Sequence, residues 1–255
     1  MLRLMKCEWQ RMMARTKTKT VLVLYLLALA FECLFLKSMG VAMYDQIRST
    51  PMNALNVAPF LLRELSLFLN FILIPMLAAD SFNGEYTSGA LRMTLLRPVS
   101  HLRLITAKWL VQGLLLGGLT AITFMVGTLF GRMALPEADT TSFLGTSAFG
   151  PGGALAYSAL FYLIAYLVFL AVLGLAALIS TVMPHPILAY AGTVCVLIGA
   201  LYLSDSFAFL MSSSDAIFRL LGGLAGSGML WISAACVMIA YGGVLLVWRR
   251  RDWTH

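Results

Sequence analysis

The sequence predicts an all-α membrane protein with six transmembrane helices, and three observations support this prediction. Of its 255 residues, 60% are hydrophobic and 11% are charged, whereas an ordinary soluble domain has about 25% charged residues. Six apolar stretches approach the length of about 20 residues that a helix needs to cross a bilayer. Basic residues gather on one side of these stretches, as topology rules require. The chain therefore leaves little room for a separate soluble catalytic domain.

The six predicted spans are joined by short polar connections. They cover residues 20–39, 64–79, 106–130, 154–183, 187–204 and 229–248. We expect residues 20–255 to form one transmembrane domain, with residues 1–19 in front of it.

The distribution of basic residues predicts the orientation of the chain. With a cytoplasmic N-terminus, 13 of the 18 Lys and Arg residues lie on the inner side and five lie outside or at the outer rim. The positive-inside rule then places both the N- and C-termini in the cytoplasm. The formal net charge of +7 is accordingly an orientation signal, and we expect no nucleic-acid partner.

Residues 1–19 have the pattern of an amphipathic helix that lies in the inner membrane interface. Leu2, Met5, Trp9 and Met12 are spaced three or four residues apart, and the basic residues lie largely elsewhere around the helix. Such a helix places its apolar stripe in membrane lipids and its cations near anionic head groups. The alternative is a basic flank that only sets the topology.

The longest inner connection, residues 80–103, contains the pattern of a short capped helix. A hydroxyl residue at position 87 or 88 can cap it, and Leu91 and Leu95 lie on one face. A helix this short is not stable alone in water. It must pack on the inner face of the protein, on lipid or on a soluble partner.

The outer connection 205–228 contains a second short apolar helix. Residues 216–224 are too few to cross the membrane and are followed by several glycines. A re-entrant or surface-lying segment fits this pattern, because irregular backbone at depth survives only where protein or water covers it. A plain outer loop fits it equally well.

Motifs for catalysis and metal binding are absent from the sequence. No glycine-rich loop ends in Lys-Ser or Lys-Thr, so we do not expect the chain to hydrolyse ATP. The three histidines and four cysteines lack the spacing of a metal site or a disulfide framework. We therefore predict no catalytic residue, no metal and no cofactor held by this chain.

Glu32 is the one ionisable residue clearly inside a predicted span. Charged side chains are costly at that depth and are functional candidates for this reason. Glu32 lies about 18 Å along its helix from residue 20, toward the outer side. We expect an intramembrane ion pair with Arg63 or Lys37, and the alternative is a contact with substrate or an ion.

The inner segment resembles the corresponding loop of ABC-2 type permeases. In that family the loop reads as a glutamate, a Gly-Thr-Leu triplet, a Leu-Leu pair, a Pro-Val-Ser-Arg run and then a lysine. Ala90 replaces the threonine here and His101 replaces the arginine. Six spans after an interfacial helix also agree with the type V exporter-like fold of this family. The matching residues are Glu85, Gly89, Leu91, Leu95, Leu96, Pro98 and Lys108.

The resemblance implies a permease subunit of an ATP-binding cassette exporter in the bacterial plasma membrane. Such a subunit dimerises, with an identical or a different copy, and receives two separate ATPase subunits that bind ATP and Mg²⁺. Residues 85–97 would act as the coupling helix between permease and ATPase. Its leucines would bury in a groove of the ATPase, while Arg92 and Arg97 would meet acidic groups at the rim.

Two other functions remain open from the residues alone. A secondary carrier driven by an ion gradient would carry polar groups at mid-membrane on broken helices in two corresponding halves, and Glu32 is a slight hint of this. A membrane anchor could use the same inner helix to recruit a soluble enzyme. The sequence does not specify the substrate.

Overall fold

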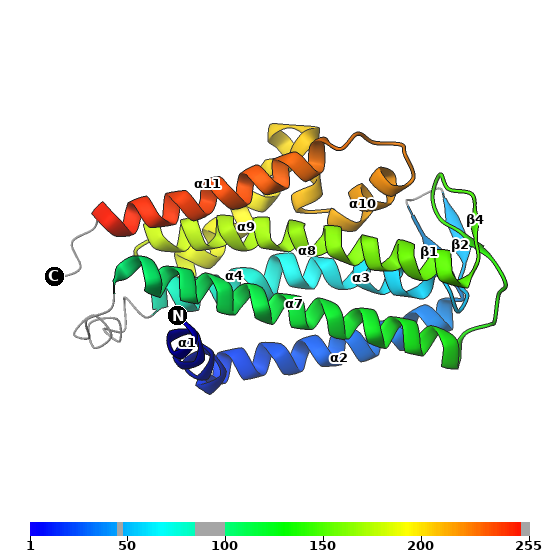
Figure 1. The fold of residues 1–255 in the computed structure, drawn as a ribbon, viewed down its shortest axis with the longest axis horizontal. Coiled ribbons are helices and arrows are strands. Elements are labelled where there is room, and N and C mark those ends of the chain that lie inside the picture. The colour runs from blue at the N-terminus through cyan, green and yellow to red at the C-terminus, as the bar shows by residue number, and fades with distance from the viewer. Residues whose placement is uncertain (45–47, 85–99, 251–255) are drawn as a thin grey trace.

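Six helices long and apolar enough to cross a membrane form an elongated bundle in the computed structural model, which describes residues 1–44, 48–84 and 100–250 (Figure 1). Each of them contains or overlaps one of the predicted spans. The fold is thus the all-α membrane fold that the sequence predicts. The helices are α2 (Thr16–Met39), a composite second span (Val57–Gly84), α7 (His101–Ala134), α8 (Pro151–Val182), α9 (Pro186–Leu203) and α11 (Gly228–Arg250).

The second span alternates between α-helix and wider π-helical turns. It consists of α3 (Val57–Phe68), η1 (Leu69–Leu73), α4 (Ile74–Ala78) and η2 (Ala79–Gly84). Pro75 has no N–H to donate to Phe71, four residues earlier. The hydroxyl of Tyr190 on α9 donates to that carbonyl at 2.9 Å instead. A neighbouring helix therefore supplies a donor to a backbone acceptor that lacks its usual partner four residues on.

Helix α8 forms the centre of the bundle and packs against α7, α9, α11 and the second span. Its inner half is rich in small residues that are fully buried, such as Ala171, Ala176 and Ala177. A side chain at Gly174 would meet the Cβ atom of Ala240 on α11 at 3.0 Å. Small residues thus permit the close approach of these two helices.

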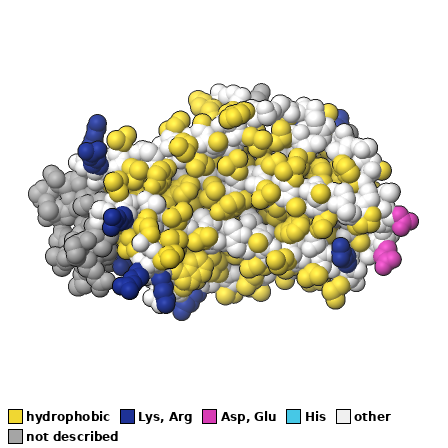
Figure 2. All heavy atoms as spheres, viewed as in Figure 1, with side chains coloured by type: hydrophobic (Ala, Val, Ile, Leu, Met, Phe, Trp, Pro, Cys, Tyr) yellow, Lys and Arg dark blue, Asp and Glu magenta, His cyan; other side chains and the backbone are white. Residues whose placement is uncertain are grey.

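The two ends of the bundle differ in charge. Figure 2 shows hydrophobic side chains over the middle, Lys and Arg side chains mostly at one end and Asp and Glu side chains at the other. The basic end carries α1, η2, the start of α7 and the last turn of α11 (Figure 1). We call it the inner end, following the positive-inside rule, and the opposite end the outer end.

The N-terminal helix α1 (Leu2–Ala14) is shorter than expected. The backbone is extended at Arg15, and Thr16–Lys19 already belong to α2. The predicted apolar stripe is also divided, because Met12 is buried against the bundle whereas Leu2 and Trp9 are exposed. The physical reason is that Glu8, which is buried beside Met12, turns this face of α1 toward α7.

Two short antiparallel hairpins, which the all-α prediction did not include, cover the outer end. One pairs β1 (Val41–Met43) with β2 (Ser49–Pro51), and the other pairs β3 (Thr141–Ser142) with β4 (Ala148–Phe149). Tyr44 joins them by donating its hydroxyl to the carbonyl of Ser142 at 3.3 Å. Burial raises the pKa of Tyr44 to about 12, so this donor stays protonated at physiological pH. We call the two hairpins the outer cap.

The segment between α9 and α11 folds back onto the bundle. It contains a 3₁₀ helix, η3 (Asp205–Leu210), and α10 (Ser213–Leu221), which packs on α3 and α8. The Asn70 amide donates to the carbonyl of Leu210 and the hydroxyl of Ser213, both at 3.2 Å. Asn70 lies about 20 Å along the second span from Val57. Of the two alternatives for this segment, a plain outer loop does not fit these contacts.

Candidate functional site: the inner polar junction

The predicted coupling helix lies outside the described residues. This applies to Glu85, Gly89, Leu91, Arg92, Leu95, Leu96, Arg97 and Pro98. The structure does describe the two elements that flank this segment, η2 before it and α7 after it. A network of polar side chains joins these two elements to α1 and α8. We call this network the inner junction; it comprises Glu8, Arg15, Asp80, Asn83, Lys108 and Gln112.

Lys108 lies at the centre of the inner junction. Its Nζ atom is 3.4 Å from Oε2 of Glu8 on α1 and donates to the carbonyl of Ser81 in η2 at 3.1 Å. Lys108 is almost completely buried. The resemblance assigned it to the contact with an ATPase, and in this structure its ammonium instead faces the protein interior. The reason is that α1 covers it with a carboxylate.

Asp80 connects the start of η2 to the joint between α1 and α2. Arg15, the residue at that joint, donates from Nη1 to Oδ2 of Asp80 at 2.7 Å. Lys17 lies 3.9 Å from the other carboxylate oxygen and is largely exposed. The α1–α2 corner and η2 are therefore linked by a short charged hydrogen bond, a type that is stronger than a neutral one.

Two side-chain amides attach the second span to its neighbours. Asn83 donates to the carbonyls of Ser180, at 3.2 Å, and Met183 at the inner end of α8. Gln112 on α7 donates to the carbonyl of Leu77 in α4 at 3.3 Å. Both amides are buried, so these bonds form where unpaired backbone acceptors would be costly.

The inner junction links the second span to its neighbouring helices. It contains ion pairs and amide contacts between helices. Within residues 1–44, 48–84 and 100–250, no group of three His, Cys, Asp or Glu residues could hold a metal ion. A displacement of η2 would act on α1, α7 and α8 together, because a buried polar network has few alternative arrangements.

The predicted ion pair between Glu32 and Arg63 is wrong. Arg63 binds Asp215 of α10 at 2.9 Å and Glu64 at 2.8 Å. The Oε2 atom of Glu32 is buried, and no described residue forms a hydrogen bond with it. The physical reason is that α10 folds back against the second span and brings Asp215 to the guanidinium.

Sequence comparison identifies the family of this chain. A family model described as ABC-2 family transporter protein matches residues 3–241. The chain belongs to the ABC-2 transporter family. A search of curated proteins finds no match.

Membership of the ABC-2 family makes the chain a membrane permease of ABC-type transport and a multi-pass membrane protein. ABC-2 permeases in general work with ATPase subunits. The family match extends from α1 to α11, so it includes every residue of the inner junction.

Sequence reasoning missed most of the inner junction. Asp80 and Asn83 stand at the end of an apolar run, where polar residues ordinarily face water or head groups. Glu8 had a detectable signal, because it is the one acidic residue among the first 19 and lies four positions before Met12. A lone acid among basic residues favours ion pairs, and Glu8 forms them with Arg11 of its own helix and with Lys108.

Proposed function

We propose that this ABC-2 permease forms a dimer, most simply of two identical copies, and receives two ATPase subunits at its inner end to move a substrate outward across the bacterial plasma membrane. The ATPase subunits bind ATP and Mg²⁺ and supply the hydrolysis. This chain supplies the membrane path and the contact that couples them.

The observation that supports this proposal is the attachment of the inner segment at both of its ends. η2 precedes residues 85–99 and is bonded to α1, α7 and α8, while α7 follows them and carries Lys108. A force applied to the segment would therefore be passed on to α1, α7 and α8. Coupled movement of packed helices as rigid bodies is a common form of large conformational change.

The contact with the ATPase would lie on the segment itself. Leu91, Leu95 and Leu96 supply an apolar face for a groove, and Arg92 and Arg97 supply charge for its rim. Rim charges orient a partner more than they add to affinity. Lys108 belongs behind this contact, where it fixes α1 and η2 in position.

The experiment that tests the coupling contact changes Leu91 and Leu95 together to Asp. Two carboxylates in an apolar groove are left without partners, which costs several kcal/mol. We expect the permease to insert normally but to lose co-purification with its ATPase and permease-dependent ATP hydrolysis. The matched control changes both residues to Met, which keeps the face apolar.

Two results would overturn the proposal. One is an Asp double variant that binds and stimulates the ATPase as the native chain does. The other is transport that continues without any ATPase and follows the proton gradient, which would favour a secondary carrier.

A further inference from the structure

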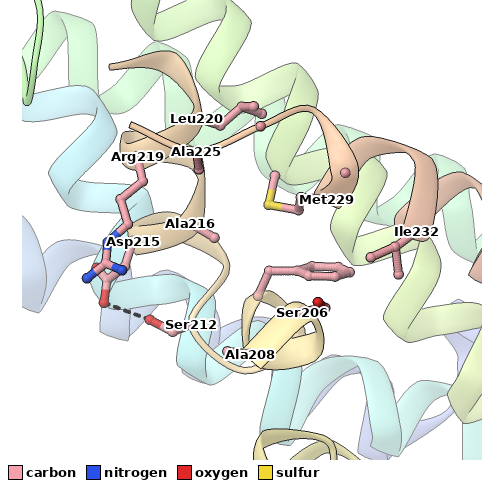
Figure 3. A pocket seen from close by; sticks show the side chains of 13 residues that line it. Ser206, Ala208, Ser212, Asp215, Ala216, Arg219, Leu220, Ala225, Met229 and Ile232 are labelled. Carbon is pink, nitrogen blue, oxygen red and sulfur yellow. Dashed lines mark hydrogen bonds between the residues drawn. The ribbon is translucent and has the colours of Figure 1, made fainter. Parts of the chain in front are cut away.

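A cavity of about 510 Å³ lies between η3, α10 and α11, in the segment that folds back onto the bundle and apart from the inner junction (Figure 3). Figure 3 shows Met229 and Ile232 of α11 on one side of it and Ala216 and Leu220 of α10 on another. Its volume falls in the range of about 300–1,000 Å³ that small-molecule sites occupy. The polar lining residues are Ser206, Ser212, Asp215 and Arg219.

Arg219 is the one basic residue in the lining of the cavity. Its side chain is exposed, and it forms no ion pair or hydrogen bond with any side chain among the described residues. Asp215, in contrast, already binds Arg63 at 2.9 Å and the Ser212 hydroxyl at 2.7 Å. A guanidinium presents several N–H groups in a plane, which matches the oxygens of a phosphate.

The surface next to the cavity is apolar and exposed. Three large side chains near the lining are exposed: Leu203 at the end of α9, Leu224 immediately before the lining residue Ala225, and Trp231 between Met229 and Ile232. Tyr202 adds a second exposed aromatic ring. Tyr and Trp concentrate at the level of the lipid head groups. These residues indicate a cavity that opens to the outer leaflet near the boundary between head groups and acyl chains.

We propose that this cavity binds one phospholipid of the outer leaflet, with an acyl chain against Phe209, Leu220, Met229 and Ile232 and the phosphate on Arg219. The part of the cavity lined by Phe209, Leu220, Met229 and Ile232 does not hold water well, because water needs two or more polar partners. A hydrocarbon chain next to the opening fills such a space without that cost. The cavity lining carries one basic residue, Arg219, and one acidic residue, Asp215, so its formal charges cancel. We therefore expect the site to recognise the phosphate group itself and not the net negative charge of a lipid.

The test measures lipid retention by the full chain in mild detergent, with neither ATPase nor ATP present. Native mass spectrometry counts the dioleoyl lipid bound per chain for phosphatidylglycerol, phosphatidylethanolamine and diacylglycerol, which has no phosphate. We expect one molecule of either phospholipid to be retained and diacylglycerol to be lost.

Two variants separate the phosphate contact from the cavity. Arg219→Gln should weaken retention of both phospholipids about tenfold, as loss of a charged hydrogen bond does. Ala216→Phe should block retention by filling the cavity. Arg132→Gln changes another exposed arginine at the outer end of α7 and should retain lipid as the native chain does.

Each remaining outcome is decisive. Retention of phosphatidylglycerol alone would overturn the phosphate contact, because phosphatidylethanolamine carries the same phosphate and differs in net charge. Equal retention by the native chain, Arg219→Gln and Ala216→Phe, or equal retention of diacylglycerol, overturns the proposal. Loss of a dimer in Ala216→Phe also overturns it, because the cavity would then lie between two copies. Since the ATPase is absent, none of these results depends on the coupling function.

Discussion

The ammonium of Lys108 lies 3.4 Å from the carboxylate of Glu8, and the two side chains are only 1% and 5% exposed. Removing two charges from water is expensive, and their attraction offsets that cost only while both partners are present. The pair therefore holds α1 against α7 only while both charged side chains are present. With the bond from Lys108 to Ser81, it makes the position of α1 depend on that of η2.

Replacing Lys108 with Met should destabilise the protein by at most about 3 kcal/mol, because the buried Glu8 carboxylate would lose its lysine and keep its bond from Arg11, at 3.1 Å. Adding Glu8→Gln should recover part of this loss, because residues in one ion pair are not additive. Thermal unfolding in detergent measures both effects. Lys6→Met serves as the control, because Lys6 is exposed on α1, the helix that carries Glu8. If the double variant lost as much stability as the sum of the two single variants, the pair would not act as a unit.

Asp80→Asn should affect coupling more than stability. The Arg15–Asp80 contact is partly exposed, with 22% and 20% of the side chains accessible, so its loss should cost only about 1 kcal/mol. It nevertheless bonds η2 to the α1–α2 corner. We expect ATP hydrolysis by a bound ATPase to respond less to the variant permease, at unchanged binding of the two proteins. Asp139→Asn, in an exposed outer loop, should leave that response intact.

Gly222→Ala should destabilise the outer cap. A Cβ atom at Gly222 would overlap the carbonyl oxygen of Leu144, which is backbone and cannot rotate away. Gly226→Ala is the matched control, because nothing lies within 4 Å of its Cβ position. We expect faster hydrogen exchange in residues 141–149 and in α10 for the first variant only. Identical exchange in both variants would show that this contact does not hold α10 in place.

The spans were predictable because hydrophobic length is a property of local sequence. Their ends were not, since contacts between helices decide them: α1 ends at Ala14, five residues early, and Arg15, the next residue, binds Asp80, which is 65 positions away. The burial of Lys108 could not be predicted for the same reason, because it depends on Glu8 of another helix. Asp215 lies 152 positions from Arg63, so no spacing rule could pair them.

The contacts of Arg63 lead to opposite expectations for two residues that the sequence paired. Arg63→Gln should loosen α10, because it removes the cation that Asp215 and Glu64 share. Glu32→Gln should leave stability unchanged or raise it slightly: within the described residues the Glu32 carboxylate gains no ion pair, and the charge of Glu64 repels it. Thermal unfolding and hydrogen exchange of α10 distinguish the two variants. A large loss of stability in Glu32→Gln would indicate that its buried oxygen binds a cation or a partner subunit, since desolvation of an uncompensated carboxylate could not account for it.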